Sequence, residues 1–368
     1  ARVLPPAGLP TALWVVPVSD LAGVARHVLD VARTGVPGWR LIFLTPPGDL
    51  PRELRTVGAE VVEGDFGPAH GLPSSARTLR DVVRRERPAV VHSHLAYADI
   101  VAALVVRGPR LVTTEHGIAR DDAVYHLSSA KSRVMALAHT ARLRRFDAAI
   151  AVSRATADAM RDKWHPKVPL TVIPNGVDPI DEVSRLAPLA PEPRKGTRGP
   201  GLRILSLARL SPEKRLPALV DGFAELRRAH PEARLTLAGT GPEEAALRRQ
   251  VERLALTDAV TMPGFVDPNL AMAEHDVLAM MSVWENCSYA LLDAAARGMG
   301  VVATSVGGNP EILPASTLVD ATDTTAIAAT LADQGLKPEV RPGLAGWPSV
   351  ADMCGRIAAT YADAGART

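Results

Sequence analysis

The first half of the chain alternates short apolar segments with longer stretches in which apolar residues recur every three or four positions. Short apolar runs predict buried strands, and the longer periodic stretches predict amphipathic helices. The expected strands cover residues 12–18, 41–44, 59–62, 89–91, 111–114, 148–152 and 170–173, and the expected helices cover 24–32, 76–85, 98–106, 128–144 and 155–163. Strands and helices that alternate this regularly predict a parallel sheet with helices on both faces.

The same alternation resumes after an interruption at 186–201, which is rich in Pro, Gly and charge and is typical of a linker or surface loop. Beyond it, the expected strands cover 204–207, 235–238, 260–262, 277–281 and 301–304, and the expected helices cover 216–229, 243–254 and 289–297. We therefore predict an α/β protein of two Rossmann-like doubly wound domains, at 1–183 and 202–345, joined by a Pro/Gly-rich linker at 184–201. Such domains bind ligands beyond the carboxyl ends of their strands, and a cleft between the domains is the expected site.

Composition narrows the class of protein. The 368 residues carry 42 Lys and Arg against 40 Asp and Glu, so there is no electrostatic case for binding nucleic acid. The two cysteines, Cys287 and Cys354, exclude a disulfide framework and a four-cysteine zinc site, and they fit a reducing cytoplasm. Arg outnumbers Lys, and Ala and Pro are abundant, which is typical of a bacterial genome of high GC content.

We also expect a cytoplasmic, soluble protein. No apolar run reaches the roughly 18 residues of a membrane span, and the first residues lack the apolar core of a signal peptide. Arginines cluster at 84–87 and at 142–145. We interpret these clusters as solvated helix faces, with peripheral membrane contact as the most that they could support.

Two acids eight residues apart give the strongest chemical signal. Glu285 follows the strand expected at 277–281, and Asp293 lies in the first turns of the helix expected at 289–297. Partial positive charge and unpaired N–H groups at a helix start suit a phosphate. An acid that caps a core helix is the alternative for these two residues taken alone. A Gly-Gly loop at 307–308 follows the next strand.

Other polar residues stand at expected strand ends. Arg209 and Lys214 follow the strand at 204–207, where two cations can neutralise a diphosphate leaving group, although a solvated loop explains them too. Gly241 follows 235–238 and fits a tight turn or a ligand contact. His116 follows 111–114, where a structural hydrogen bond is the alternative to a role in catalysis.

His92 and His94 end another strand and raise the question of a metal. We place them on opposite faces of the strand, which makes a poor metal site without further ligands. Cys287 lies beside Glu285, but no base stands near it in sequence, so we interpret it as a packing residue. No metal site is expected.

Residues 285–311 resemble the E-x7-E region and the following Gly-Gly-x-Pro-Glu loop of retaining glycosyltransferases with the GT-B fold, family 4 or glycosyl transferases group 1. The resemblance implies that Glu285 contacts the donor sugar and that Asp293 binds the nucleotide ribose. Ser288, Tyr289 and Ala290 are then donor-binding residues. Asp293 replaces the usual Glu, and Asn-Cys-Ser replaces the usual Gly-Phe-Gly after the first acid.

Further segments are similar to motifs of the same family. The resemblance implies that Arg209 and Lys214 clamp the donor diphosphate, that Gly241 lies near the donor, and that Gly264 and Phe265 contact its base. A position in the apolar core is the alternative for Phe265. In the first half, Gly23 marks a loop beside the donor phosphate, and His116, in Thr-Glu-His-Gly, supports the transition state. Residues 346–368 resemble the terminal helix that crosses back onto the first domain.

The resemblance implies a retaining hexosyltransferase that moves a hexose-type sugar from a nucleotide diphosphate, with UDP favoured, to a hydroxyl acceptor. Cell-envelope polysaccharide or a secondary metabolite is the expected product. The catalytic group comprises His116, Glu285, Arg209 and Lys214, the first domain binds the acceptor and the second binds the donor. Without an Asp-x-Asp motif, no metal and no cofactor are expected.

Three other functions remain as alternatives. A nucleotide-sugar epimerase or hydrolase on the same fold would turn over donor without acceptor. A non-catalytic nucleotide-sugar binding protein would not need the histidine and both acids together. A NAD-dependent dehydrogenase would need Gly-x-Gly-x-x-Gly after its first strand, which the turn at 19–24 lacks.

Overall fold

A computed structural model of the chain describes residues 8–118, 139–178 and 200–365. The chain forms two compact units. Unit 1 comprises Ala1–Gly176 and Pro348–Thr368, and unit 2 comprises Val177–Trp347. The sequence placed the first boundary after residue 183 and the terminal segment at 346. Most of the expected linker at 184–201 lies outside the described residues.

Unit 1 is built on a seven-stranded sheet in the order β3-β2-β1-β4-β5-β6-β7, in which every pairing is parallel. The strands are β1 (Thr11–Val15), β2 (Arg40–Thr45), β3 (Glu60–Glu63), β4 (Val90–His94), β5 (Arg110–Glu115), β6 (Ala148–Ala151) and β7 (Leu170–Val172). The order reverses between β1 and β4, so the loops after β1 and β4 run away from each other. A parallel sheet has its ligand-binding crevice at such a switch point.

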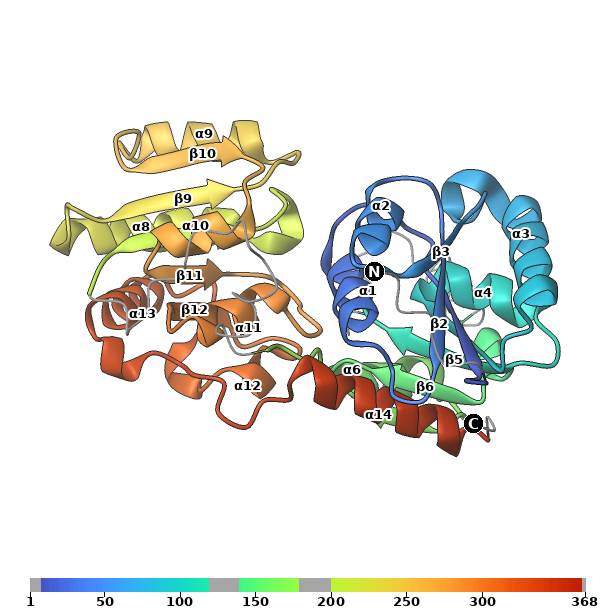
Figure 1. Ribbon diagram of the computed structural model, residues 1–368. Coiled ribbons are helices and arrows are strands. Elements are labelled where there is room, and N and C mark those ends of the chain that lie inside the picture. Colours follow the sequence, from blue (N-terminus) through green and yellow to red (C-terminus); the bar gives the residue numbers. More distant parts are fainter. Residues whose placement is uncertain (1–7, 119–138, 179–199, 366–368) are drawn as a thin grey trace. The chain divides into compact units, whose positions relative to one another are not determined.

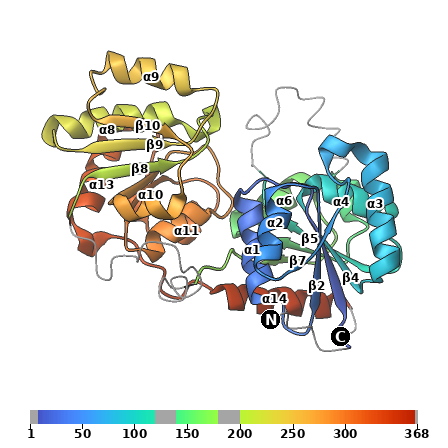
Figure 2. The ribbon, with the colours of Figure 1, turned by 45° about the horizontal axis from the view of Figure 1, so that its top comes forward.

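Helices cover both faces of this sheet (Figures 1 and 2). They are α1 (Gly23–Thr34), α2 (Asp49–Thr56), α3 (Gly71–Glu86), α4 (Leu95–Val105), α6 (Arg154–Trp164) and α14 (Val350–Asp363). Successive residues of a strand point to opposite faces, so Trp14 packs with α1, α2 and α14, whereas Leu13 packs with α3 and α4. The two apolar cores of the unit follow from this alternation.

Helix α14 completes unit 1 from the far end of the sequence and lies beside α1 (Figure 1). A capping box between Ser349 and Asp352 begins it. Near its end, the fully buried Tyr361 hydroxyl accepts the Trp14 indole N–H at 3.0 Å and lies 2.7 Å from His92 Nδ1. Burial holds the pKa of Tyr361 well above its usual value. The hydroxyl therefore links the terminal helix to two strands of the sheet.

Unit 2 repeats the architecture with a six-stranded parallel sheet in the order β10-β9-β8-β11-β12-β13. Its strands are β8 (Arg203–Leu207), β9 (Arg234–Ala238), β10 (Val260–Gly264), β11 (Val277–Met280), β12 (Gly300–Thr304) and β13 (Leu318–Val319). Its helices are α8 (Leu216–Ala229), α9 (Glu244–Arg253), α10 (Pro268–Glu274), α11 (Tyr289–Ala296), α12 (Asn309–Ile312) and α13 (Thr324–Leu336). One core lies between the sheet and α8, α9 and α13, and the other between the sheet and α10, α11 and α12.

The predicted fold class, two parallel α/β sheets with interleaved helices, is confirmed. The strand prediction missed only the two-residue β13 among the described strands, and the helix prediction missed α2, α10, α12 and α13. Most of the helix expected at 128–144 lies outside the described residues. None of the described helices has both the length and the apolar character that spanning a membrane requires.

Replacing Tyr361 by Phe should lower the free energy of unfolding by about 1–3 kcal/mol, because the buried Trp14 indole N–H would lose its acceptor. Denaturant unfolding measures the change. Tyr97→Phe is the matched control, since that hydroxyl has a part-buried partner, Ser75 Oγ, at 3.0 Å. Equal losses in the two variants would contradict the role given to Tyr361.

Candidate functional site

Two loops of unit 2 meet at an ion pair. The loop after β8 ends in a 3-10 turn, Pro212–Lys214, and the loop after β11 carries Glu285. Lys214 Nζ donates to Glu285 Oε1 at 2.5 Å, and the two side chains are only 24% and 15% exposed. Because β8 and β11 are neighbours in the sheet, residues far apart in sequence meet at its carboxyl edge. The structure thus brings together two of the predicted catalytic residues.

A third loop, the Gly-Gly loop after β12, packs on Glu285. Gly308 N donates to the Glu285 carbonyl oxygen at 2.9 Å, and Gly307 has a left-handed φ of 52°. A Cβ on Gly307 would lie 1.9 Å from that same carbonyl oxygen. Only glycine fits there, so the loop fixes the backbone that presents the Glu285 carboxylate.

Arg209 belongs to the same loop as Lys214 but lies apart from the ion pair. Its side chain is 71% exposed, and its Nη2 donates to Glu213 Oε1 at 2.7 Å. Glu213 also accepts from Ser211 Oγ at 2.6 Å, and these donors lower the pKa of Glu213 although its partial burial opposes them. The structure therefore places a second cation in this loop, held by an acid rather than aimed at Glu285.

Gly241 packs closely against the loop after β8. A Cβ on Gly241 would lie 2.3 Å from the Leu210 carbonyl oxygen, and one on Gly239 would lie 1.9 Å from the Ala208 carbonyl oxygen. The turn after β9 therefore lies directly against the loop that carries Arg209 and Lys214. A tight turn explains both glycines, and ligand contact at Gly241 stays a prediction.

The remaining predicted donor residues surround the start of α11 and the end of β10. Ser288 caps α11, its Oγ accepting from Leu291 N, and Tyr289 and Ala290 are the first helical residues. Asp293 follows one turn later and is half-buried. At the end of β10, Gly264 has φ 79° and Phe265 is 83% exposed. An apolar ring this exposed is a candidate contact surface.

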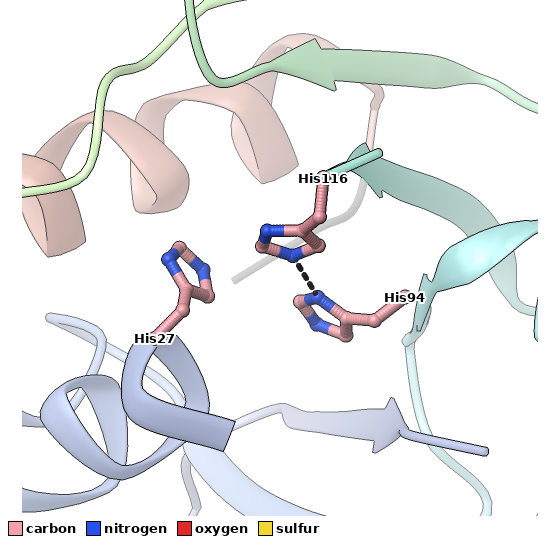
Figure 3. A group of neighbouring side chains, drawn as sticks. All are labelled: His27, His94 and His116. Atoms are coloured by element: carbon pink, nitrogen blue, oxygen red, sulfur yellow. Dashed lines mark hydrogen bonds between the residues drawn. The ribbon is translucent and has the colours of Figure 1, made fainter. Parts of the chain in front are cut away.

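In unit 1, His116 lies directly after β5 and joins a histidine cluster (Figure 3). Its Nε2 lies 2.9 Å from Nδ1 of His94, the last residue of β4, and the two rings are stacked. The ring of His27, from α1, meets that of His116 edge-on at 4.8 Å between centroids. Sequence reasoning missed His27, because its helix pattern is that of an ordinary amphipathic helix.

Burial keeps these imidazoles uncharged. It lowers the pKa of His27 to about 4, with a hydrogen bond to Asn175 opposing it, and it lowers the pKa values of His94 and His116 well below their usual range. Near pH 7 each ring therefore has one N–H and one lone pair. His116 can donate or accept a hydrogen bond, but it cannot act as a cation.

The expected placement of His92 and His94 on opposite strand faces was wrong. Residues two apart in a strand share a face, and the two rings stack at 4.6 Å between centroids. Both nitrogens of His92 have partners, the Tyr361 hydroxyl and Thr114 Oγ1. His92 is therefore a structural residue, whereas His94 faces the cluster.

Two further residues, Gly23 and Arg142, have surroundings that the sequence alone did not show. Gly23 begins α1, where a Cβ would meet nothing within 4 Å, so packing does not require glycine there. Arg142 was expected on a solvated face but is buried, and its guanidinium bridges Asp99 at 2.6 Å and Glu115 at 3.0 Å. Sequence reasoning missed this network because its members come from three separate elements.

Replacing Gly307 by Ala should lower both the Tm and any activity that depends on Glu285, because the new methyl group would displace the Glu285 carbonyl oxygen and φ would be strained. Gly343→Ala is the matched control in the same unit, since its Cβ would meet nothing within 4 Å and φ is not positive. Differential scanning calorimetry of both variants measures the effect. A Tm loss no larger than that of the control would contradict this account of the loop.

Comparison with known proteins places both halves of the chain in glycosyltransferase families. Residues 21–180 match the family described as Glycosyltransferase Family 4, and residues 201–333 match Glycosyl transferases group 1. The chain is 27% identical over 318 residues to one of the subunits of human phosphatidylinositol N-acetylglucosaminyltransferase, covering 82% of this chain and 62% of that protein. It is 29% identical over 330 residues to the putative colanic acid biosynthesis glycosyltransferase WcaL of Escherichia coli, covering 85% and 70%.

Solved structures show the same fold. The Anabaena protein HepE, crystallised with UDP and glucose, superposes with a TM-score of 0.76 at 20% identity, covering 96% of this chain and 99% of that one. A glycosyltransferase from Rickettsia africae superposes with a TM-score of 0.73 at 17% identity, covering 98% and 100%. The chain thus shares the GT-B architecture of these proteins.

Proposed function

The chain belongs to the glycosyltransferases of family 4, or glycosyl transferases group 1, and from this premise we propose that it moves a hexose-type sugar from UDP to an acceptor hydroxyl with retention of configuration. The observation that carries the proposal is the Lys214–Glu285 pair at the carboxyl edge of unit 2. A cation and a carboxylate in contact suit a substrate that joins an anionic diphosphate to a sugar.

Unit 2 binds the donor in this proposal. Lys214 turns from Glu285 to the diphosphate, and Arg209 leaves Glu213 to join it. The N–H groups at Tyr289 and Ala290, where α11 begins, face the phosphates, as helix starts commonly do. Asp293 binds the ribose, and Gly264 and Phe265 contact the base. UDP in the HepE crystals supports the choice of base.

Unit 1 supplies His116 and binds the acceptor. Neutral His116 holds a sugar hydroxyl by a hydrogen bond, and His94 orients its ring at 2.9 Å. The N-terminus of α1 has no side-chain cap and no acid in its first turn, which favours a phosphate beside Gly23.

The reaction that we propose is a front-side displacement. The acceptor oxygen bonds to the anomeric carbon as the bond from that carbon to the UDP oxygen breaks, and a donor phosphate oxygen takes the acceptor proton. Glu285 favours positive charge developing at the anomeric carbon, while Lys214 and Arg209 offset negative charge on the departing diphosphate. These two cations make a donor-bound metal ion unnecessary.

Cell-envelope polysaccharide is the acceptor class that we favour, supported by the similarity to a putative colanic acid glycosyltransferase. The chain spans 62% of the human relative, so that protein's lipid substrate is a weaker guide. We propose that the protein works in the cytoplasm. Neither cysteine is in a disulfide, which agrees with a reducing compartment.

Replacing Lys214 or Arg209 by Ala should lower kcat about 100- to 1,000-fold, the usual cost of losing one preorganised group that stabilises transition-state charge. Initial rates with UDP-hexose and a hydroxyl acceptor measure the loss. Arg248→Ala is the control, because Arg248 forms an exposed ion pair with Glu244 on α9. Wild-type rates in both loop variants would mean that the diphosphate binds elsewhere.

Substituting Glu285 and substituting Asp293 should change different kinetic constants. Glu285→Gln should lower kcat, because its interaction with the anomeric carbon strengthens in the transition state, whereas Asp293→Asn should mainly raise the donor KM, because ribose contact is uniform along the reaction. Donor titrations at saturating acceptor separate the constants. The opposite pattern would refute the assigned roles without refuting the transferase activity.

Activity should survive an excess of EDTA, because Lys214 and Arg209 already supply the positive charge that a divalent ion would bring to the diphosphate. Assays with EDTA, with added Mg²⁺ and with neither should give equal rates. Complete loss in EDTA, restored by Mg²⁺, would contradict a metal-independent donor site.

A further inference from the structure

Three imidazoles converge at the carboxyl edge of the unit 1 sheet, from α1, from the end of β4 and from the residue after β5 (Figure 3). One ring nitrogen each of His27, His94 and His116 lies within 4.8 Å of the others, and this is the group with metal-ligand chemistry found among the described residues. Tetrahedral zinc with Zn–N bonds of about 2.0–2.1 Å sets its nitrogens about 3.3 Å apart. Small ring rotations therefore suffice to form such a site.

His27 is already held in the tautomer that a metal requires. Its Nδ1 lies 3.2 Å from the Asn175 amide oxygen, which can only accept, so Nδ1 carries the proton and Nε2 carries the lone pair. His27 Nε2 is buried without a hydrogen-bond partner among the described residues. A ligating histidine whose other nitrogen donates to a carbonyl is the usual arrangement in metal sites.

His94 Nδ1 and His116 Nε2 lie 2.9 Å apart, and one of these two nitrogens carries the proton that it donates to the other. His94 Nε2 is buried and, within the described part of the chain, accepts or donates no hydrogen bond. If that proton moves to the other nitrogen of its own ring, His94 Nδ1 and His116 Nε2 both offer lone pairs to a metal ion. No proton is released overall, because each neutral ring still carries one.

We propose that His27, His94 and His116 bind a transition-metal ion of the Zn²⁺ type, and that the bound ion inhibits sugar transfer. Three neutral imidazoles with a fourth position open to water form a recognised zinc geometry. Imidazole ligands select zinc over Mg²⁺, which prefers oxygen. The inhibition rests on the proposed function, because the metal takes His94 Nδ1 and His116 Nε2, the two nitrogens whose contact orients the His116 ring for the sugar. The metal binding itself does not depend on that function.

The binding test uses the full chain, stripped with EDTA and titrated with Zn²⁺ against a chromophoric chelator. Wild type should bind one ion, and His27→Gln and His94→Gln should each lose more than 100-fold in affinity. Asn175→Ala, which removes the acceptor behind His27, should lose about 10- to 100-fold. His165→Asn, at an exposed histidine of the same unit, should bind as wild type does. Equal affinities in all variants, or no binding at micromolar zinc, would overturn the site.

A measurement on the wild type alone guards against variants that fail to fold. Co²⁺ in a four-coordinate nitrogen site gives a much stronger visible absorption than octahedral Co²⁺. The strong band should appear on titration and disappear when Zn²⁺ is added. A weak, octahedral spectrum would overturn the proposed coordination.

Inhibition is tested separately. Zn²⁺ should abolish transfer by the wild type, EDTA should restore it, and His27→Gln should keep its own zinc-free rate in the same assay. Equal inhibition of the wild type and His27→Gln would overturn the inhibitory role, because zinc would then be acting on the nucleotide or elsewhere. A chain that binds zinc as predicted but has no transferase activity would refute the proposed function and leave the metal site standing.

Discussion

The contact between Lys214 and Glu285 joins two loops of unit 2 that lie far apart in sequence, and a backbone hydrogen bond from Val283 N to the Glu213 carbonyl oxygen at 2.8 Å joins the same two loops. β8 and β11 are neighbours although many residues separate them in sequence, and the loop after β12 packs on the backbone of Glu285 through Gly307 and Gly308. A part-buried charge is costly without its partner. The pair therefore keeps a lysine and a carboxylate in place, and in the proposed function each exchanges the other for a charged or polar group of the substrate.

The unit 1 sheet has the same kind of switch point as the unit 2 sheet, but side chains of different chemistry lie at it. The unit 1 sheet reverses order between β1 and β4, as the unit 2 sheet does between β8 and β11. His27 comes from α1, which follows β1, His94 is the last residue of β4, and His116 directly follows β5. In unit 2, the loops after β8, β11 and β12 supply Lys214, Glu285 and the Gly-Gly pair. The switch point is thus charged in one unit and made of neutral imidazoles in the other, because burial keeps those rings unprotonated.

The sequence was informative wherever a residue's environment follows from its own segment. Apolar runs predicted the strands, and polar residues at the predicted strand ends placed Lys214, Glu285 and His116 at the carboxyl edges of the two sheets, where the structure has them. It failed where the environment comes from a distant segment. His27 lies in an ordinary amphipathic helix pattern, and its ring contacts His94 at the end of β4 and His116 after β5. Arg142 is buried, and its ion-pair partners Asp99 and Glu115 belong to other elements. The misplacement of His94 was an error of strand geometry, since side chains two apart share a face. The family is confirmed, while the donor and acceptor roles of single residues remain predictions.

Ligand-induced stabilisation is the most direct test of a unit 2 donor site organised by Lys214. A ligand present at 100 times its Kd stabilises the folded chain by about 2.7 kcal/mol, which a thermal-shift assay detects readily. Across a panel of UDP, GDP and TDP, each with and without a hexose, UDP and UDP-hexose should raise the Tm of the wild type, and Lys214→Ala should lose most of that rise. No shift with any nucleotide, or an equal shift in wild type and Lys214→Ala, would contradict the account.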